Sequence, residues 1–143
     1  ACILNDWFKM YNLIYNRAVK YIKKYGLVSK ITLRAEVKAR FTAQFKRQIK
    51  HSKLRAHTLA NAIFDAHKAY TSSIARTRLD GRPFRIRYRK TNSQAALLIE
   101  KEAFGDEGMA IRTLGPMDLG IASNKVLHDC RIKKENRIYW KNF

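Results

Sequence analysis

The spacing of apolar residues changes at residue 80, and this change most constrains the fold. Upstream, apolar side chains recur every three or four residues, the spacing of helices that each bury one face. Over residues 84–89 apolar residues and arginines alternate without a break, which is the period of a β-strand. The sequence Asp80-Gly81-Arg82-Pro83 between the two patterns favours a turn. We therefore expect helices followed by strands, an α+β arrangement.

Three helices are expected before this turn, over residues 3–25, 31–50 and 54–78. In the second helix the apolar residues step by four, and Ser29 or Thr32 is positioned to cap its start. Short strands are expected after the turn, over residues 84–89, 95–101, 109–113, 128–133 and 137–141. The prediction is a three-helix bundle over residues 1–80, followed by a small, mostly antiparallel β region over residues 81–143.

The chain carries a large excess of positive charge. Its 143 residues include 30 Lys+Arg and 11 Asp+Glu, a formal net charge of +19 at pH 7. Such a chain repels itself unless a polyanion neutralises it, and nucleic acid is the leading candidate partner. An anionic membrane is the competing partner, but no apolar run approaches the ~18–20 residues of a membrane span. Two distant cysteines and no visible secretory signal favour an intracellular setting.

Arginine is concentrated in the alternating segment and its flanks. A strand over residues 84–89 would place Arg85, Arg87 and Arg89 on one face, where guanidinium groups suit bidentate contact with phosphates. A half-exposed strand with a solvated basic face is the plainer interpretation of the same pattern. The candidate contacts to a nucleic-acid backbone are Lys46, Arg47, Lys50, Arg76, Arg78, Arg82, Arg85, Arg87, Arg89 and Lys90.

No residue set in the sequence has the spacing of a catalytic or metal site. Asp118, in an Asp-Leu-Gly-Ile segment, resembles the first acidic motif of RuvC/RNase H-like nucleases. Two-metal hydrolysis needs several converging carboxylates, and only Asp129 and Glu135 follow it. Asp118 is therefore interpreted as a strand-edge or loop residue, with an Mg²⁺ ligand as the alternative. The histidines and cysteines lack zinc-site spacing.

Several segments, taken in order, resemble one known family. They are Tyr15-Asn16-Arg17-Ala18 in the first helix, the third helix from Leu54 to Tyr70, the stretch Gly81-Arg82-Pro83-Phe84 with the basic residues after it, and Asp129-Cys130-Arg131. Their order resembles that of the TnpB (OrfB-type) proteins of insertion sequences, and the last segment resembles their Fanzor relatives. These proteins are RNA-guided DNA endonucleases.

The resemblance implies a helical recognition lobe over residues 1–80 and a wedge-like portion of an OB-like β-barrel over residues 81–143. It implies a guide RNA and target double-stranded DNA as partners. A nuclease-bearing chain is a further partner if this chain is one piece of a split assembly; the alternatives are a fragment and a truncated relative. The family's RuvC-like nuclease and zinc-ribbon segments are absent from this chain, so Mg²⁺ and Zn²⁺ would belong to that absent region, and catalysis by this chain alone is not expected. The implied location is the cytoplasm of a prokaryote, or the nucleus of a eukaryotic or virus-infected cell.

The resemblance also implies positions that face the DNA motif flanking the target. They are Thr32, Arg34, Lys38, Arg55, His57, Thr58, Asn61, Asn92, Ser93 and Gln94. A solvated polar position is the plainer interpretation of each. For the whole chain, the alternatives are a general basic RNA- or DNA-binding module and a transposon-derived DNA-binding repressor.

Overall fold

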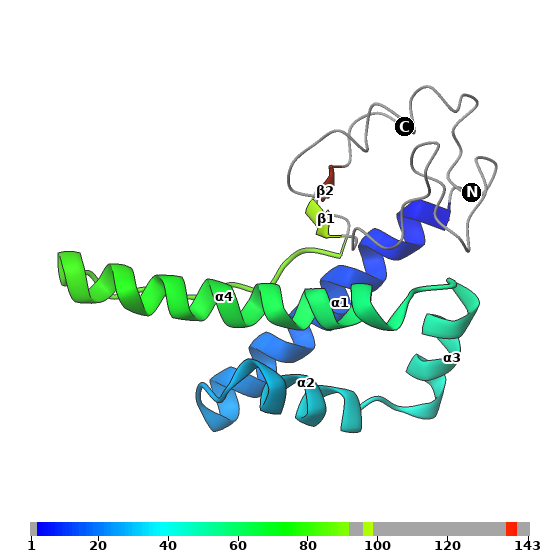
Figure 1. The fold of residues 1–143 in the computed structure, drawn as a ribbon, viewed down its shortest axis with the longest axis horizontal. Helices are drawn as coiled ribbons and strands as arrows, with labels where there is room; N and C mark the ends of the chain where they lie inside the picture. The colour runs from blue at the N-terminus through cyan, green and yellow to red at the C-terminus, as the bar shows by residue number, and fades with distance from the viewer. Residues whose placement is uncertain (1–2, 92–95, 99–136, 140–143) are drawn as a thin grey trace.

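The fold is a computed structural model that describes residues 3–91, 96–98 and 137–139, with side chains described for residues 6–91. The chain order of its helices and strands is α1 (Ile3–Tyr25), α2 (Lys30–Ala39), α3 (Ala43–His51), α4 (Ala56–Asp80), β1 (Ala96–Leu98) and β2 (Arg137–Tyr139). The long helices α1 and α4 pack against each other, and α2 contacts both (Figure 1). The two strands pair antiparallel, with Leu97 opposite Ile138, and β1 lies beside α4.

The predicted bundle-plus-barrel fold class is wrong. The described part of the chain is helical, and no β-barrel is present in it. Residues 84–89 are extended, yet within the described part of the chain no strand pairs with them. The alternating sequence specified an extended backbone, but it does not specify what that backbone bonds to. The strands predicted over residues 109–113 and 128–133 lie outside the described residues, and the predicted boundary between residues 80 and 81 stays a prediction.

The single helix predicted over residues 31–50 is two helices. Ser29 caps α2, because its hydroxyl accepts a hydrogen bond from the Thr32 backbone N–H at 3.2 Å. Thr42 then caps α3 in the same way, accepting from the Phe45 backbone N–H at 3.2 Å. The four-residue spacing of apolar residues continues across the break: Phe41 lies before it and Phe45 after it, and their rings meet edge to face. Because the apolar spacing is continuous, it predicted one helix and did not indicate the break at the Thr42 cap.

The other two helices were predicted within two residues. The prediction of 3–25 for α1 is confirmed, and α4 spans Ala56–Asp80 against the predicted 54–78. Both helices end at a glycine with positive φ, Gly26 at 89° and Gly81 at 68°. A residue with a side chain rarely adopts this left-handed conformation, which is why glycine so often follows a helix.

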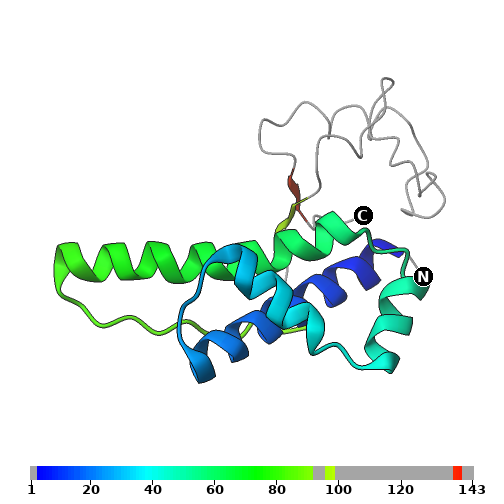
Figure 2. The ribbon, with the colours of Figure 1, turned by 60° about the horizontal axis from the view of Figure 1, so that its bottom comes forward.

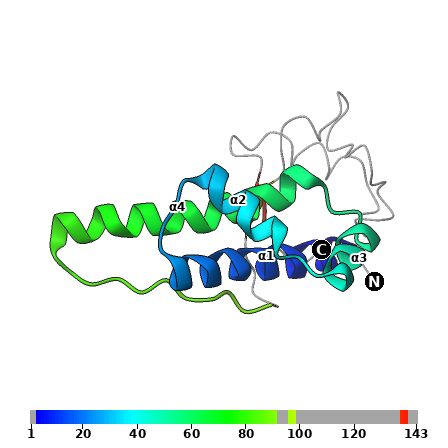
Figure 3. The same cartoon turned by 90° about the horizontal axis from the view of Figure 1, so that it is seen from below.

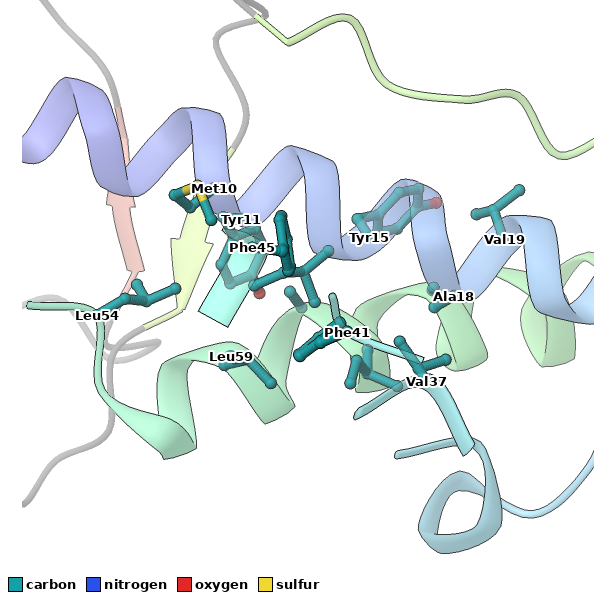
Figure 4. Packing of buried hydrophobic residues seen from close by; sticks show 14 of the residues in the cluster. Met10, Tyr11, Tyr15, Ala18, Val19, Val37, Phe41, Phe45, Leu54 and Leu59 are labelled. Atoms are coloured by element: carbon teal, nitrogen blue, oxygen red, sulfur yellow. The ribbon is translucent and has the colours of Figure 1, made fainter. Parts of the chain in front are cut away.

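The core lies between α1 and α4 and is closed on one side by α2 and α3. Figure 4 shows Val37, Phe41 and Phe45 filling the space between the two long helices. Trp7 and Tyr11 on α1 are fully buried, and each buries a polar atom with a partner. The Trp7 indole donates to the Ser52 carbonyl at 2.6 Å, and the Tyr11 hydroxyl donates to an Asp65 carboxylate oxygen at 2.6 Å.

Two asparagines on α1 hold the extended segment that follows α4. The Asn16 side chain donates to the Arg89 carbonyl and accepts from the Arg89 backbone N–H, both at 2.7 Å. One turn earlier, Asn12 donates to the carbonyls of Lys90 and Thr91, at 3.4 and 3.3 Å. An asparagine amide offers the same donor and acceptor as a peptide group, so Asn16 replaces the strand neighbour that the segment lacks.

Asn16→Ala is expected to free this segment from α1. The Arg89 amide loses its acceptor, and a net loss of about 1 kcal/mol for one hydrogen bond corresponds to roughly fivefold faster hydrogen exchange. Residue-resolved exchange by NMR measures it. Lys20→Ala, one turn further along α1 and exposed, should leave Arg89 unchanged. Unaltered exchange in Asn16→Ala would show that the two bonds do not hold the segment.

Candidate nucleic-acid interface

Positive charge dominates the described side chains. Residues 6–91 include 22 Lys+Arg and only four carboxylates, those of Asp6, Glu36, Asp65 and Asp80. Three of these carboxylates already bind neighbours: Glu36 pairs with Arg40 at 2.6 Å, Asp65 accepts from Tyr11, and Asp80 accepts from the Arg82 backbone N–H at 3.0 Å. Most cations among residues 6–91 therefore have no carboxylate from the same residues to neutralise them.

The end of α4 and the segment after it form a projecting basic arm. We define the arm as residues 71–87. Figures 2 and 3 show α4 extending past the other helices, with the extended segment running back beside it. The Tyr70 ring on α4 and the Phe84 ring on the extended segment meet edge to face, with their centroids 6.2 Å apart. Asp80 is the arm's one carboxylate, and its five cations are all exposed: Arg76, Arg78, Arg82, Arg85 and Arg87.

Eight of the ten predicted backbone contacts fall into two groups on different elements. Five lie on the arm, as above, and Lys46, Arg47 and Lys50 are exposed on α3. Arg89 differs from its neighbours, because it is half-buried with its guanidinium carbon 3.8 Å from the centroid of the Tyr15 ring. Lys90 is exposed beside it. The arginine row of the sequence is thus split, with Arg85 and Arg87 facing solvent and Arg89 stacked on α1.

The positions implied to face a flanking DNA motif differ in their exposure to solvent. Thr32 and His57 are exposed, whereas Arg34, Lys38, Arg55 and Asn61 are half-buried. Thr58 is fully buried, so its side chain is not available at the surface of the described fold. Burial, followed by repulsion from Arg34, lowers the pKa of Lys38. Asn92, Ser93 and Gln94 lie outside the described residues.

A basic and aromatic groove opens between α1, the end of α2 and the extended segment. Its volume is about 490 Å³. The residues that line it are Leu13, Asn16, Arg17, Lys20, Tyr21, Lys24, Tyr25, Val37, Arg40 and Tyr88. Four of them are cations, three are tyrosines and none is a carboxylate. We call this hollow the tyrosine groove.

A second hollow continues along the same face of α1. It has a volume of about 560 Å³ and lies between α1 and α3, where Lys9, Arg47 and His51 line it with Asp6. Leu13 lines both hollows. Between Asp6 and Lys24 the helix rises about 27 Å, so the two hollows together follow most of α1.

Cations stack on the aromatic rings around the tyrosine groove. The Arg40 guanidinium lies 5.0 Å from the Tyr21 ring centroid and 5.3 Å from that of Tyr25, and the Lys23 ammonium lies 4.4 Å from the Tyr88 centroid. Hydrogen bonds from Arg40 and then Lys24 lower the pKa of Tyr25. Such stacks hold the cations in place without neutralising them.

Arg17 shows the same arrangement at the back of the groove. Its guanidinium carbon lies 3.9 Å from the Phe45 ring centroid, and burial lowers its pKa. Among the described residues no carboxylate pairs with it. A half-buried cation of this kind is a ready site for an external anion.

Comparisons with known proteins give no relative. No family model matches the chain, and no curated protein or solved structure matches it significantly. The site must therefore be interpreted from its own geometry.

The described part of the chain contains neither a candidate metal site nor a candidate membrane-spanning helix. No group of three or more His, Cys, Asp or Glu side chains gathers there in a way that would hold a metal ion. None of its helices is both long enough and apolar enough to cross a membrane. Asp118 lies outside the described residues.

The tyrosine groove was missed in the sequence, although part of its signal is present. Lys9, Arg17, Lys20 and Lys24 recur on α1 at helical spacing and form a basic stripe beside the apolar one. Arg40 and Tyr88 come from segments far away in the chain, and only the packing of α2 and the extended segment on α1 brings them to this stripe.

Proposed function

We propose that this chain binds nucleic acid, as the guide-RNA- and target-DNA-binding part of a TnpB- or Fanzor-like RNA-guided DNA endonuclease. The observation that supports nucleic-acid binding is the charge of the described fold, which has 22 Lys and Arg side chains and only four carboxylates over residues 6–91. A surface with so few internal counter-charges attracts a polyanion strongly and releases counterions when it binds one.

The shape of the surface supports the same function. The arm presents five exposed arginines, and α3 presents three further cations. Guanidinium groups on a projecting arm suit phosphate contact, because each can donate two parallel hydrogen bonds to one phosphate. Contacts of this kind position a protein on a nucleic acid without reading its sequence.

The family part of the proposal rests on the order of the sequence motifs. In RNA-guided effectors base pairing reads sequence, and the protein contacts the backbone. This division suits a surface rich in phosphate-binding groups. The proposed partners are a guide RNA, target double-stranded DNA and a nuclease-bearing chain, and the proposed location is intracellular. A general basic RNA- or DNA-binding module is the second candidate, favoured by the helical character of the described fold.

The test is to express the chain in its native genetic context, purify it without nuclease treatment and sequence the nucleic acid that accompanies it. One discrete non-coding RNA is expected, and its affinity for the purified chain should fall steeply with salt. At six to ten phosphate contacts the affinity falls by about 10³–10⁵ between 50 and 200 mM salt.

Other outcomes separate the candidates. A random mixture of RNA and DNA that high salt removes would exclude the guide-RNA assignment and leave the general module. Duplex DNA without any RNA would favour a transposon-derived repressor. A chain that binds no nucleic acid even at low salt would overturn the proposed function altogether.

A further inference from the structure

We infer that the tyrosine groove holds a single-stranded stretch of nucleic acid, with phosphates on its cations and at least one base stacked on its tyrosines. This inference rests on the proposed function and specifies which strand form one site takes. Its basis is that the groove combines four cations, three of them without a carboxylate partner among the described residues, with exposed rings in a hollow of about 490 Å³. Hollows of this size hold small ligands of many kinds, and a nucleotide is within their range.

The cations are arranged to contact consecutive phosphates. Arg17, Lys20 and Lys24 follow one another along α1 at steps of three and four residues, so their side chains share one face. Arg40 reaches the same hollow from the end of α2. Glu36 pairs with Arg40, so this guanidinium is the one partly neutralised cation of the four. A strand that follows α1 would meet the other three in turn.

The tyrosines offer exposed ring surface on which a base can stack, beside the cations that already contact them, Lys23 at Tyr88 and Arg40 at Tyr25. Tyr25 is 53% exposed and Tyr88 is 51% exposed, high values for large rings that also line a hollow. Tyr21 is half-buried, with its ring centroid 4.8 Å from that of Tyr25. Stacking on aromatic side chains is independent of base identity, because every base has a π-face.

Rings at this position favour a single strand over a duplex. Bases inside a duplex are stacked on one another and paired, so their faces are closed to the protein. A duplex resting on the groove would contact the cations but leave the tyrosines unused. The arm, residues 71–87, has exposed arginines and a single aromatic ring, that of Phe84. Such a surface suits contact with a duplex as well as with a single strand. The tyrosine groove is therefore assigned to a single strand, and the arm to phosphate contact with either form of nucleic acid.

The experiment measures affinity for labelled single-stranded RNA, single-stranded DNA and a duplex of the same sequence. Tyr25→Leu and Tyr88→Leu remove the rings but keep apolar bulk at two exposed positions. Each is expected to weaken single-strand binding by about 5- to 150-fold, the equivalent of one lost stacking contact, and duplex binding by less than about twofold. Tyr25→Phe and Tyr88→Phe keep the ring and are expected to retain affinity.

Photo-crosslinking gives an independent readout. Bromouridine-substituted RNA should cross-link to a peptide that contains Tyr25 or Tyr88. The RNA and DNA arms show which strand the groove prefers, and circular dichroism of each variant confirms that the helices remain folded.

Three results would overturn the inference while the proposed function stands. They are an equal loss for duplex and single strand in the leucine variants, no loss for either, and displacement of the strand by oligoglutamate at matched charge concentration. The last would show that the groove takes any polyanion, including an acidic peptide. Failure of the unmodified chain to bind any nucleic acid is a different result, since it overturns the proposed function itself.

Discussion

Trp7→Ala is expected to lower the free energy of unfolding by about 3–5 kcal/mol, the range seen when a large aromatic side chain is removed from a core. Trp7 is fully buried on α1, and its indole N–H donates to the carbonyl of Ser52, which is itself buried after α3. The substitution leaves a cavity and an acceptor without its donor. A loss of this size is a large share of the stability of an ordinary domain. Urea denaturation followed by far-UV circular dichroism measures it.

Two matched variants separate the causes. Trp7→Phe keeps most of the apolar volume but removes the donor to Ser52, so its loss should be smaller, about 1–3 kcal/mol. Leu79→Ala truncates a side chain that is 89% exposed near the end of α4, and its effect should stay within about 0.5 kcal/mol. If Trp7→Ala were no more destabilising than Leu79→Ala, Trp7 would not be part of the core.

The double variant Arg85→Glu, Arg87→Glu is expected to weaken nucleic-acid binding by at least about 100-fold, with no loss of stability. Both arginines are exposed on the arm and face solvent. A hydrogen bond to a charged group contributes about 1.5 kcal/mol or more, which is roughly tenfold in affinity for each arginine. The salt dependence should also flatten, by about 1.4 to 1.8 in log–log slope for two lost phosphate contacts. Fluorescence anisotropy over a salt series measures both quantities.

A charge-matched control distinguishes contact from general repulsion. Lys68→Glu, combined with Lys53→Glu, reverses two exposed cations that the proposal does not use. It changes the net charge equally and should reduce affinity far less, with little change in slope. Equal losses in both double variants would mean that the chain attracts nucleic acid by its overall field, and the arm would then have no special role.

Residues 84–89 show where sequence reasoning succeeded and where it failed. The alternation indicated an extended backbone, but the predicted strand is wrong, and of the three arginines it placed on one face only Arg85 and Arg87 are exposed. It did not indicate which groups bind the backbone of this segment: the Asn16 side chain on α1, and not a neighbouring strand, forms hydrogen bonds with the backbone of Arg89. Asn12 and Asn16 lie one turn apart, and on a helix such a pair is ordinarily a polar face. Nothing in their spacing indicates that a segment more than 70 residues later binds there.

The prediction of a single helix over residues 31–50 failed for a related reason. Apolar periodicity reports which residues face the core, and Phe41 and Phe45 face it from both sides of the break. The Thr42 cap was visible in the sequence, but threonine also occurs within helices. Its role as a cap depends on the extended conformation of its backbone, φ −66° and ψ 159°, which the residue type alone does not specify.

By itself the sequence determined α1 and α4, the apolar stripes that form the core and the excess of positive charge, because local spacing and composition are properties of neighbouring residues. Only the tertiary structure decided how that charge is distributed. Packing of α2 and the extended segment on α1 brings Arg40 and Tyr88 to the basic stripe of Arg17, Lys20 and Lys24. A groove is a relation between residues far apart in the chain, and one that forms from three segments leaves no single pattern in any of them.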